Sequence, residues 1–329
     1  MKNAVYCTKN LDPWHNLAME EYLLQKVGKK QIFFFLWQNQ NTVVIGKNQN
    51  PWKECCFSLL EKEGGKLARR ISGGGAVFHD TGNLNFSFLV DREMYDLSRQ
   101  LEVILGAIRS LGIEAEFQGR NDLLAQGKKF SGNAFCFKPE SALHHGTILV
   151  SADMNKLTRY LQVSPEKIRS KGIDSVRSRV VNLSELKPGL TIELISESLM
   201  ASFQKIYGND FSFYEDGMVE EEEIQALYAK YSSWEWRYGE APHFDIEISH
   251  AFSWGFLDMC FQVSNAKIVQ AIAYSDAMDE AFIQKLSEIL KGCKLHANSI
   301  KECIQIFPWG EECKEMAQEI ASWIEKKEF

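Results

Sequence analysis

The sequence predicts an α+β protein with a large N-terminal domain and a small C-terminal α+β domain. Short aromatic or β-branched runs typical of strands alternate with amphipathic patterns typical of helices through the first part of the chain. After Pro242 the pattern begins again with strands and then helices, so we place the domains at residues 1–244 and 245–329. The chain of 329 residues is long enough for both cores.

The N-terminal domain is expected to open with a helix and two strands. Asp12 precedes Pro13, as an N-cap precedes a first helical residue, and apolar residues then recur at helical spacing. Residues 32–37 and 42–46 are short, aromatic or β-branched, and separated by a polar stretch. They are expected to form two buried strands.

Further elements follow before the domain boundary. Residues 101–111 carry an apolar helical stripe that Gly112 is placed to end, and residues 147–150 are expected to form a strand. Thr191 is expected to cap another helix. The acidic run at 220–223 favours a helix start, where negative charge is stabilising, over a patch for a partner.

The C-terminal domain shows a hairpin followed by helices. Strands are expected at 256–263 and 268–274, joined by a turn at 264–267. Two helices are expected at about 279–290 and 311–326.

Composition and charge narrow the class of protein. A net charge of −7 disfavours general nucleic-acid binding, which depends on Lys and Arg. The sequence shows no apolar signal-peptide core and no stretch of about 20 apolar residues, so we expect a cytoplasmic protein without a membrane partner. Eight cysteines show no CxxC pair or zinc-type spacing, so we expect reduced thiols and assign no metal ligand.

The most informative segment is RRISGGGAVFHDTGN at residues 69–83. Successive glycines at 73–75 let backbone N–H groups face an anion without obstruction. The segment leads into an alternating strand, whereas a P-loop opens a helix, so neither Walker nor Rossmann phosphate binding fits. A tight turn would explain the glycines alone, but Arg69, Arg70 and His79 beside them favour a site for a charged substrate.

Three more clusters follow along the chain. Lys129 enters an expected strand beside Ser-Gly, where its ammonium would stabilise negative charge at phosphorus or carbonyl, although a surface lysine is the plainer alternative. A histidine pair begins the segment at 144–150. Residues 167–179 hold five cations, which fits a phosphate-facing loop or an exposed helix end.

Together these clusters resemble the lipoate–protein ligase A family. The resemblance covers essentially the whole chain. Its motifs are NLAMEE at 16–21, VIGKNQN at 44–50, RRISGGGAVFHDTGNLNFSF at 69–88, GRNDLL at 119–124, KFSGNA at 129–134, HHGTILV at 144–150, SVRSRVVNLSEL at 175–186, and WEWRYG at 234–239 with Pro242.

The resemblance implies a fold and a set of site residues. The fold would be a large catalytic domain with a mixed β-sheet flanked by helices, plus a small accessory domain. Lys129, placed by the following Phe-Ser-Gly, would be the central catalytic lysine. The ATP and lipoate pocket would be formed by Arg70, Ser72, Gly73, Gly74, Gly75, Ala76, Val77, Phe78, His79, Asn83, Asp122, Lys129 and His145.

The resemblance also implies a reaction. The enzyme would activate free lipoate with ATP to lipoyl-AMP, and transfer the lipoyl group to a lysine of an E2 lipoyl domain or a glycine cleavage H protein. Mg²⁺ is expected with ATP, because it offsets the triphosphate charge. Trp37, Val77 and Phe78 would supply an apolar groove, unless they are plain core residues.

Three alternatives make different demands on the sequence. An ATP-independent lipoyl or octanoyl transferase often needs a reactive cysteine, and only Cys136 lies near the motifs, between two phenylalanines typical of a buried strand. A lipoyl-binding regulator without turnover predicts damaged motifs, yet the glycines and lysine are intact. A biotin ligase would carry an arginine-rich glycine loop in place of SGGGA.

Overall fold

The chain folds into two compact units in a computed structural model that describes residues 3–119, 121–161, 180–214, 219–238 and 244–327. Unit 1 comprises Met1–Ile45, Trp52–Arg70 and Ala76–Arg237. Unit 2 comprises Gly46–Pro51, Ile71–Gly75 and Tyr238–Phe329. Two short N-terminal stretches, one of them holding the glycine run, therefore group with the C-terminal part of the chain.

A mixed eight-stranded sheet forms the centre of unit 1. The two strand pairs at one end of the sheet are parallel and the other five pairs are antiparallel, so the sheet is mixed, as expected. The order is β11 (Phe211–Phe213), β1 (Asn3–Cys7), β2 (Ile32–Trp37), β6 (Asn83–Asp91), β10 (Ser141–Leu149), β9 (Lys128–Phe137), β8 (Asp122–Ala125) and β7 (Ala115–Gln118).

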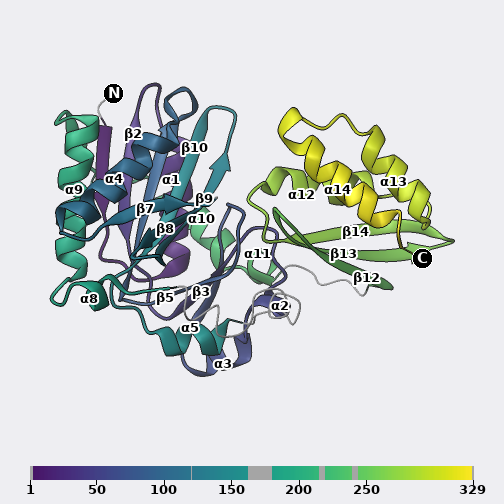
Figure 1. The fold of residues 1–329 in the computed structure, drawn as a ribbon, viewed down its shortest axis with the longest axis horizontal. Coiled ribbons are helices and arrows are strands. Elements are labelled where there is room, and N and C mark those ends of the chain that lie inside the picture. Colours follow the sequence, from purple (N-terminus) through teal and green to yellow (C-terminus); the bar gives the residue numbers. More distant parts are fainter. Residues whose placement is uncertain (1–2, 120, 162–179, 215–218, 239–243, 328–329) are drawn as a thin grey trace. The chain divides into compact units, whose positions relative to one another are not determined.

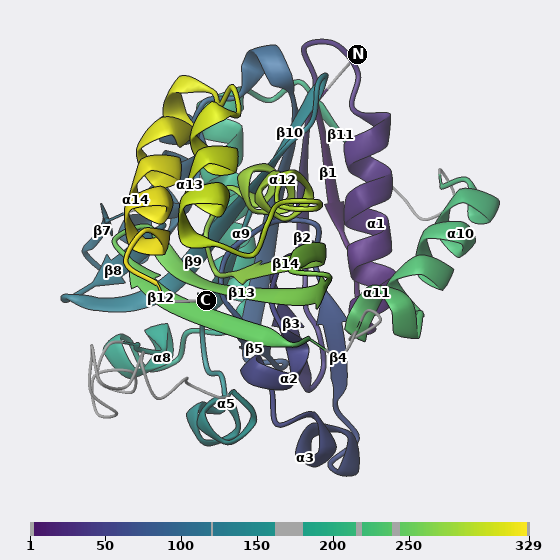
Figure 2. The ribbon, with the colours of Figure 1, turned by 90° about the vertical axis from the view of Figure 1, so that its right-hand side faces the viewer.

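Helices cover both faces of this sheet. α4 (Leu97–Ser110) and α9 (Ile192–Tyr207) lie on one face and share its apolar core, where Phe34 stacks between Phe88 and Phe203 (Figure 1). α1 (Pro13–Lys26) lies on the other face and packs beside α10 (Glu221–Ser232) (Figure 2). Every residue of β6 is buried. The alternating side chains of this strand therefore point to two faces of the sheet that are both covered, and neither face is open to solvent.

A small mixed sheet in unit 1 holds the two ends of the glycine loop. β3 (Thr42–Ile45) pairs in parallel with β4 (Lys66–Arg69) and antiparallel with β5 (Val77–His79). The chain therefore leaves β4 just before the glycines and re-enters at β5 just after them. Shorter helices surround the sheets: α2 (Pro51–Glu54), α3 (Phe57–Lys62), α5 (Met154–Tyr160), α8 (Leu183–Leu186) and α11 (Trp234–Tyr238).

Most elements expected in unit 1 are confirmed. Asp12 caps α1 by accepting from the Trp14 backbone N–H, Thr191 caps α9, and Gly112 ends α4 with φ +81°. The strand expected at 147–150 is wrong in extent, because β10 begins six residues earlier. The first half of β10 includes His144 and His145, whose polar side chains obscured the strand pattern in the sequence. Both histidines are buried in the structure and have hydrogen-bond partners.

Unit 2 contains a three-stranded antiparallel sheet covered on one face by three helices. The elements are β12 (Ile246–Phe252), β13 (Gly255–Ser264), β14 (Lys267–Ser275), α12 (Glu280–Ile289), α13 (Ala297–Ile306) and α14 (Lys314–Ile324). The expected hairpin turn is confirmed, with positive φ at Asn265 and Ala266. The first strand and the middle helix were not expected from the sequence.

One expectation about the cysteines is wrong. Cys293, just after α12, is bonded to Cys303 on α13 as a disulfide. The ten-residue spacing gave no signal, because the two thiols meet only once the helices pack. The other six cysteines form no disulfide.

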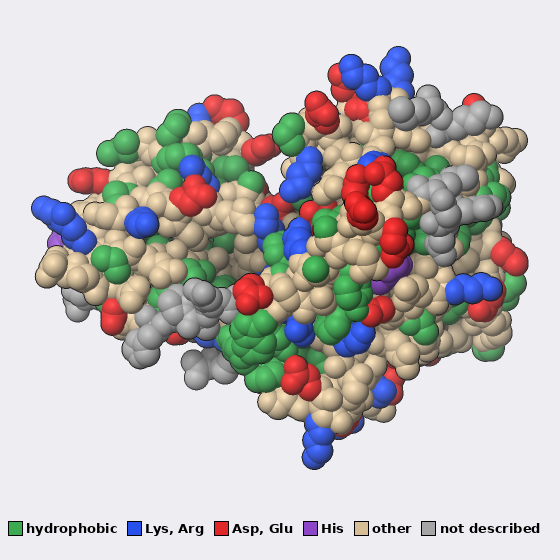
Figure 3. Space-filling view, turned by 180° about the vertical axis from the view of Figure 1, so that it is seen from behind, with side chains coloured by type: hydrophobic (Ala, Val, Ile, Leu, Met, Phe, Trp, Pro, Cys, Tyr) green, Lys and Arg blue, Asp and Glu red, His purple; other side chains and the backbone are tan. Residues whose placement is uncertain are grey.

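The described surface carries both positive and negative side chains, as the similar numbers of basic and acidic residues in the sequence predict. Lys and Arg side chains are interspersed with Asp and Glu over the face in Figure 3, rather than gathered in one basic field. Among the described residues, no helix combines the length and the apolar character needed to cross a bilayer.

Candidate functional site

A row of side chains crosses the α1 face of the main sheet. Asp122 on β8 pairs with Gly132 on β9, and Thr147 on β10 pairs with Asn85 on β6, which in turn pairs with Trp37 on β2. The Gly132 N–H donates to Thr147 Oγ1 over 3.2 Å and joins the two halves. Residues paired across a sheet share a face, so distant motifs meet along one line.

Lys129 lies at one end of this row. Its Nζ is 2.7 Å from Asp122 Oδ1, and about a third of its side chain is exposed. A Cβ placed on Gly132 would lie 2.9 Å from Lys129 Nζ. The end of the lysine side chain therefore lies over Gly132, in the space that a larger side chain would fill. The Val181 N–H donates to the Lys129 carbonyl over 2.9 Å. The basic run at 167–179, just before Val181, lies outside the described residues.

His145 belongs to a buried polar network at the other end of the face. Its Nδ1 is 2.8 Å from Glu20 Oε1, and Ser87 Oγ donates to the same oxygen over 2.5 Å. The Trp37 indole N–H donates to Ser87 Oγ over 3.0 Å. Glu20 comes from α1 and is only 1% exposed. Glu20 and Ser87 were not expected to have a role, although both lie inside the motifs.

His79 is a neutral donor beside this network. Asn16 donates to Asn39 Oδ1, which turns the Asn39 amide nitrogen toward His79 Nδ1 at 3.1 Å. The His79 proton therefore sits on Nε2. Burial lowers the pKa of His79 to about 3, with further lowering by the charges of Arg70 and His145.

Four buried polar atoms near these residues have no hydrogen-bond partner among the described residues. They are Glu20 Oε2, His79 Nε2, Asn83 Oδ1 and Asn85 Nδ2. Buried polar groups are normally bonded, because leaving one unmatched costs about 1–3 kcal/mol. The face is therefore suited to receive polar groups from a ligand or from water.

The two arginines beside the glycine loop have different surroundings. Arg69 donates through its guanidinium to the backbone carbonyls of Trp236 and Arg237, and the Trp236 indole donates back to the Arg69 carbonyl. This fastens β4 to α11 and gives Arg69 a structural task. Arg70, also buried, donates to the Val44 carbonyl and lies close enough to His79 to affect its pKa.

The strand that follows the glycine loop places the other expected residues. Val77 is half-buried and pairs with Val44, whereas Phe78 is buried against Tyr160, with ring centroids 5.4 Å apart. Phe78 is thus a core residue of the small sheet. Ala76 is half-buried.

The glycines belong to unit 2 and meet its backbone. The Gly74 N–H, at φ +88°, donates to the Ala277 carbonyl over 3.1 Å. A Cβ on Gly73 would lie 2.5 Å from the Ala277 oxygen and 2.7 Å from the Met278 oxygen, whereas one on Gly75 would meet nothing. Ser72 is buried, and its carbonyl accepts from the Lys47 N–H. Close backbone packing therefore explains two of the three glycines.

Cys136 is a fully buried residue of β9, as its two flanking phenylalanines indicated. Burial of this kind disfavours a thioester nucleophile, which must be accessible. The burial of Cys136 therefore does not support the acyltransferase alternative, which needs an accessible cysteine.

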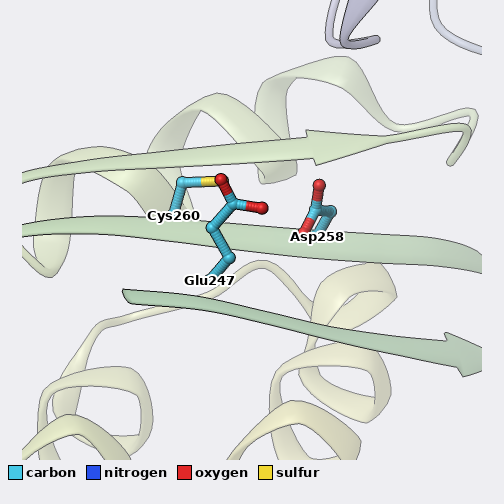
Figure 4. Close-up of side chains that lie close together, drawn as sticks. All are labelled: Glu247, Asp258 and Cys260. Carbon is cyan, nitrogen blue, oxygen red and sulfur yellow. The ribbon is translucent and has the colours of Figure 1, made fainter. Parts of the chain in front are cut away.

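A second group of potential ligands lies in unit 2. Glu247 on β12 pairs with Cys260 on β13, and Asp258 shares their face, opposite to the helices (Figure 4). Their donor atoms lie within 4.8 Å of one another. Two carboxylates and a thiol match neither the all-oxygen sets of Mg²⁺ nor a four-ligand zinc site, so we assign no metal to them.

Family models match most of the chain. The lipoyl protein ligase A/B catalytic domain matches residues 12–204, and the bacterial lipoate protein ligase C-terminus matches residues 241–324. The first match alone spans more than half of the sequence.

Solved structures agree with these matches. P. falciparum LipL1, solved in complex with lipoate, is 30% identical over 99% of this chain and 100% of its own, with a TM-score of 0.85. A bipartite lipoate protein ligase from Thermoplasma acidophilum, described with its E2 lipoyl domain, is 27% identical over 75% and 100%, with a TM-score of 0.64. A lipoate-protein ligase A bound with ATP is 26% identical over 73% and 99%, with a TM-score of 0.62. We conclude that the chain belongs to the lipoate–protein ligase family of enzymes.

Proposed function

We propose that this enzyme activates free lipoate with ATP and attaches the lipoyl group to a lysine of an acceptor protein. A lipoate carboxylate oxygen attacks the α-phosphorus of ATP, the bond to pyrophosphate breaks, and lipoyl-AMP forms. The unprotonated amine of the acceptor lysine then attacks the lipoyl carbonyl carbon. AMP leaves, and the amine nitrogen loses a proton as the amide forms.

The observation that carries the proposal is the position of Lys129. Its ammonium is held at the end of a row that runs toward Trp37, three strand spacings of about 4.8 Å away, or roughly 14 Å. A carboxylate at Lys129 would leave the acyl chain lying across the strands and the apolar ring near Trp37. Lys129 would then stabilise the charge that develops on phosphate and carbonyl oxygens.

The remaining expected residues have supporting roles in this proposal. Arg70 and His79 would contact polar substrate groups, and Asp122 would orient Lys129. Glu20 and Ser87 would hold His145. The glycine run, with Ser72, would contribute backbone to the nucleotide site, and the nucleotide would enter as its Mg²⁺ complex, with no protein ligand to the metal assigned.

The proposal also covers acceptors and domains. The Thermoplasma acidophilum ligase, which is described together with its E2 lipoyl domain, supports an E2 lipoyl domain as acceptor, and the glycine cleavage H protein is the second candidate. We propose that residues 1–244 form the catalytic domain and residues 245–329 the accessory domain.

The first experiment measures modification and activation together. An apo lipoyl domain and an apo H protein are each incubated with enzyme, lipoate and Mg-ATP, and followed by mass spectrometry and pyrophosphate release. We expect a mass gain of one lipoyl group only when ATP is present. Lipoyl transfer from a holo carrier without ATP would instead identify an acyltransferase.

A matched pair of lysine variants tests the role of Lys129. We expect Lys129→Ala to lower the rate of lipoyl-AMP formation by about 100- to 1000-fold, because one preorganised charge donor is lost. Lys128→Ala, at the exposed neighbouring position on the same strand, should retain the wild-type rate. Equal rates for the two variants would remove Lys129 from the mechanism.

A further inference from the structure

His144 is a fully buried histidine that the proposed chemistry does not use. It lies on β10 beside His145 but points to the opposite face of the sheet, into the apolar core. Three aromatic rings surround it: Phe86, Phe88 and Phe135 have centroids 5.5, 5.7 and 4.9 Å from the imidazole. In such surroundings both ring nitrogens need defined partners.

The hydrogen-bond pattern determines which nitrogen carries the proton. The Asn133 side-chain nitrogen donates to the Asn121 carbonyl over 3.0 Å, so Asn133 Oδ1 is turned toward His144 Nε2, 2.9 Å away. His144 Nε2 must therefore donate, and Nδ1 must accept. Gln100 Oε1 lies 2.9 Å from Nδ1, but one neutral ring cannot donate to two oxygens. Because Asn133 is fixed by Asn121, we assign the Gln100 amide with its oxygen and nitrogen exchanged, so that its NH₂ donates to Nδ1 and the otherwise unpartnered Gln100 nitrogen gains an acceptor.

The ring is neutral, which makes this pattern possible. Burial lowers the pKa of His144 to about 3, with a smaller lowering from His145. A neutral imidazole has one donor and one acceptor, and the two amides match them.

Asn133 passes this constraint to the strand that carries Asp122. Its backbone N–H and its side chain both donate to the Asn121 carbonyl, and the Asn121 side chain donates back to the Asn133 carbonyl. Three hydrogen bonds thus clasp the residue before Asp122 to the residue after Gly132. Lys129 crosses the sheet at Gly132, so the clasp lies beside the Lys129–Asp122 pair.

We propose that His144 is a positioning residue which, through Asn133 and Asn121, holds Asp122 against Lys129. The proposal rests on the proposed function in one respect, since it takes Lys129 as the group that stabilises developing charge. Without the His144 N–H, Asn133 Oδ1 loses its donor in the core. The Asn133 amide then rotates toward another donor, and the hydrogen bond from its side-chain nitrogen to the Asn121 carbonyl breaks.

Kinetics of two His144 variants test this chain. We expect His144→Leu to lower kcat for lipoyl-AMP formation by about 10- to 100-fold, with KM for lipoate changed less than about threefold, because positioning rather than binding is lost. His144→Gln places an amide N–H near the former Nε2 and should restore kcat to within about threefold of wild type. Ile148→Ala is the matched control, since Ile148 is equally buried on the same strand and the same core face.

The control separates positioning from plain destabilisation. Ile148→Ala should lower the unfolding midpoint yet keep the wild-type kcat under conditions where the variant is folded. If His144→Leu behaves like Ile148→Ala, or if His144→Gln rescues nothing, the positioning role is overturned while the ligase function stands. In a Lys129→Ala background, His144→Leu should cause no further loss of rate.

A spectroscopic measurement does not depend on activity. Long-range ¹H–¹⁵N correlation of the imidazole should show the Nε2–H tautomer of His144 in wild-type enzyme, unchanged between about pH 5 and 8. The Nδ1–H tautomer or a charged ring would refute the hydrogen-bond chain. If Lys129→Ala retained full activity, the proposed role of Lys129 would fail, and this measurement would still decide whether the hydrogen-bond chain exists.

Discussion

Replacing Gly132 by alanine adds one methyl group at the point where the Lys129 side chain crosses the sheet. The added Cβ would lie 2.9 Å from Lys129 Nζ and 3.0 Å from its Cε. Carbon contacts are comfortable only at about 3.5–4.0 Å, so the lysine must move by roughly 0.5–1 Å. The backbone itself can stay, because Gly132 has no positive φ and the crowded atoms end a flexible side chain.

The expected effect is large on rate and small on stability. A displacement of about 1 Å in a group that aligns reacting atoms can cost roughly 100-fold in rate. Removing glycine from a strand interior also limits the unfolded chain, which stabilises the fold by about 0.5–1 kcal/mol and offsets the new contact. We therefore expect a rate 10- to 100-fold below wild type, and a free energy of unfolding within about 1 kcal/mol of it.

Pyrophosphate release with saturating lipoate and Mg-ATP gives the rate, and denaturant unfolding gives the stability. Gly310→Ala is the matched control, since a Cβ there meets nothing within 4 Å and its φ is not positive. A wild-type rate for Gly132→Ala would refute the position of Lys129. A loss of rate that parallels a loss of stability would refute the local mechanism.

Two further predictions concern buried charge. His79 and His144 have pKa values lowered to about 3, against about 6.5 when unfolded, so below pH 6.5 the unfolded chain takes up protons that the folded chain refuses. The stability contributed by the neutral histidines is complete above pH 6.5. It is lost as the pH falls toward 3, by about 1.4 kcal/mol per pH unit for each histidine. Denaturant unfolding should therefore show that the free energy of unfolding of His144→Leu falls with decreasing pH by about 1.4 kcal/mol per unit less than that of wild type. Arg69→Met should lower the free energy of unfolding by about 2–4 kcal/mol, because two buried carbonyls lose a charged donor, with KM for ATP unchanged; an unchanged unfolding midpoint would contradict the structural assignment of Arg69.

The elements that sequence could predict are those whose signals are local. The cap at Asp12 and the turn at residues 264–267 depend on a few neighbouring residues, and both are confirmed. The α+β class followed from the alternation of strand-like and helix-like runs, and the mixed sheet followed from the motifs taken together. The first half of β10 was missed because its two histidines are matched by hydrogen-bond partners elsewhere in the sequence. The strand β12 was missed because none of its residues is fully buried.

The candidate site shows the same division. Lys129 and Asp122 were expected and lie 2.7 Å apart, and His145 and Asn83 share their sheet face. Glu20 gave no signal of its own, since a glutamate on an amphipathic helix normally faces water, and only packing of α1 on the sheet brings it to His145. Arg69 was expected to contact a substrate because it lies beside the glycine run in the sequence. In the structure its guanidinium instead donates to backbone carbonyls of α11.

The grouping of the glycine run with the C-terminal residues bears on how the chain can be dissected. Unit 2 is assembled from three separate stretches, so no single cut along the chain releases it whole. A cut after residue 244 would strip the Gly74 N–H of its acceptor at Ala277 and the Asn48 carbonyl of the Ser275 N–H. Such a truncation leaves residues 1–244 with loop backbone groups that have lost their hydrogen-bond partners. Its behaviour would report on an unfinished surface as much as on the chemistry of the domain.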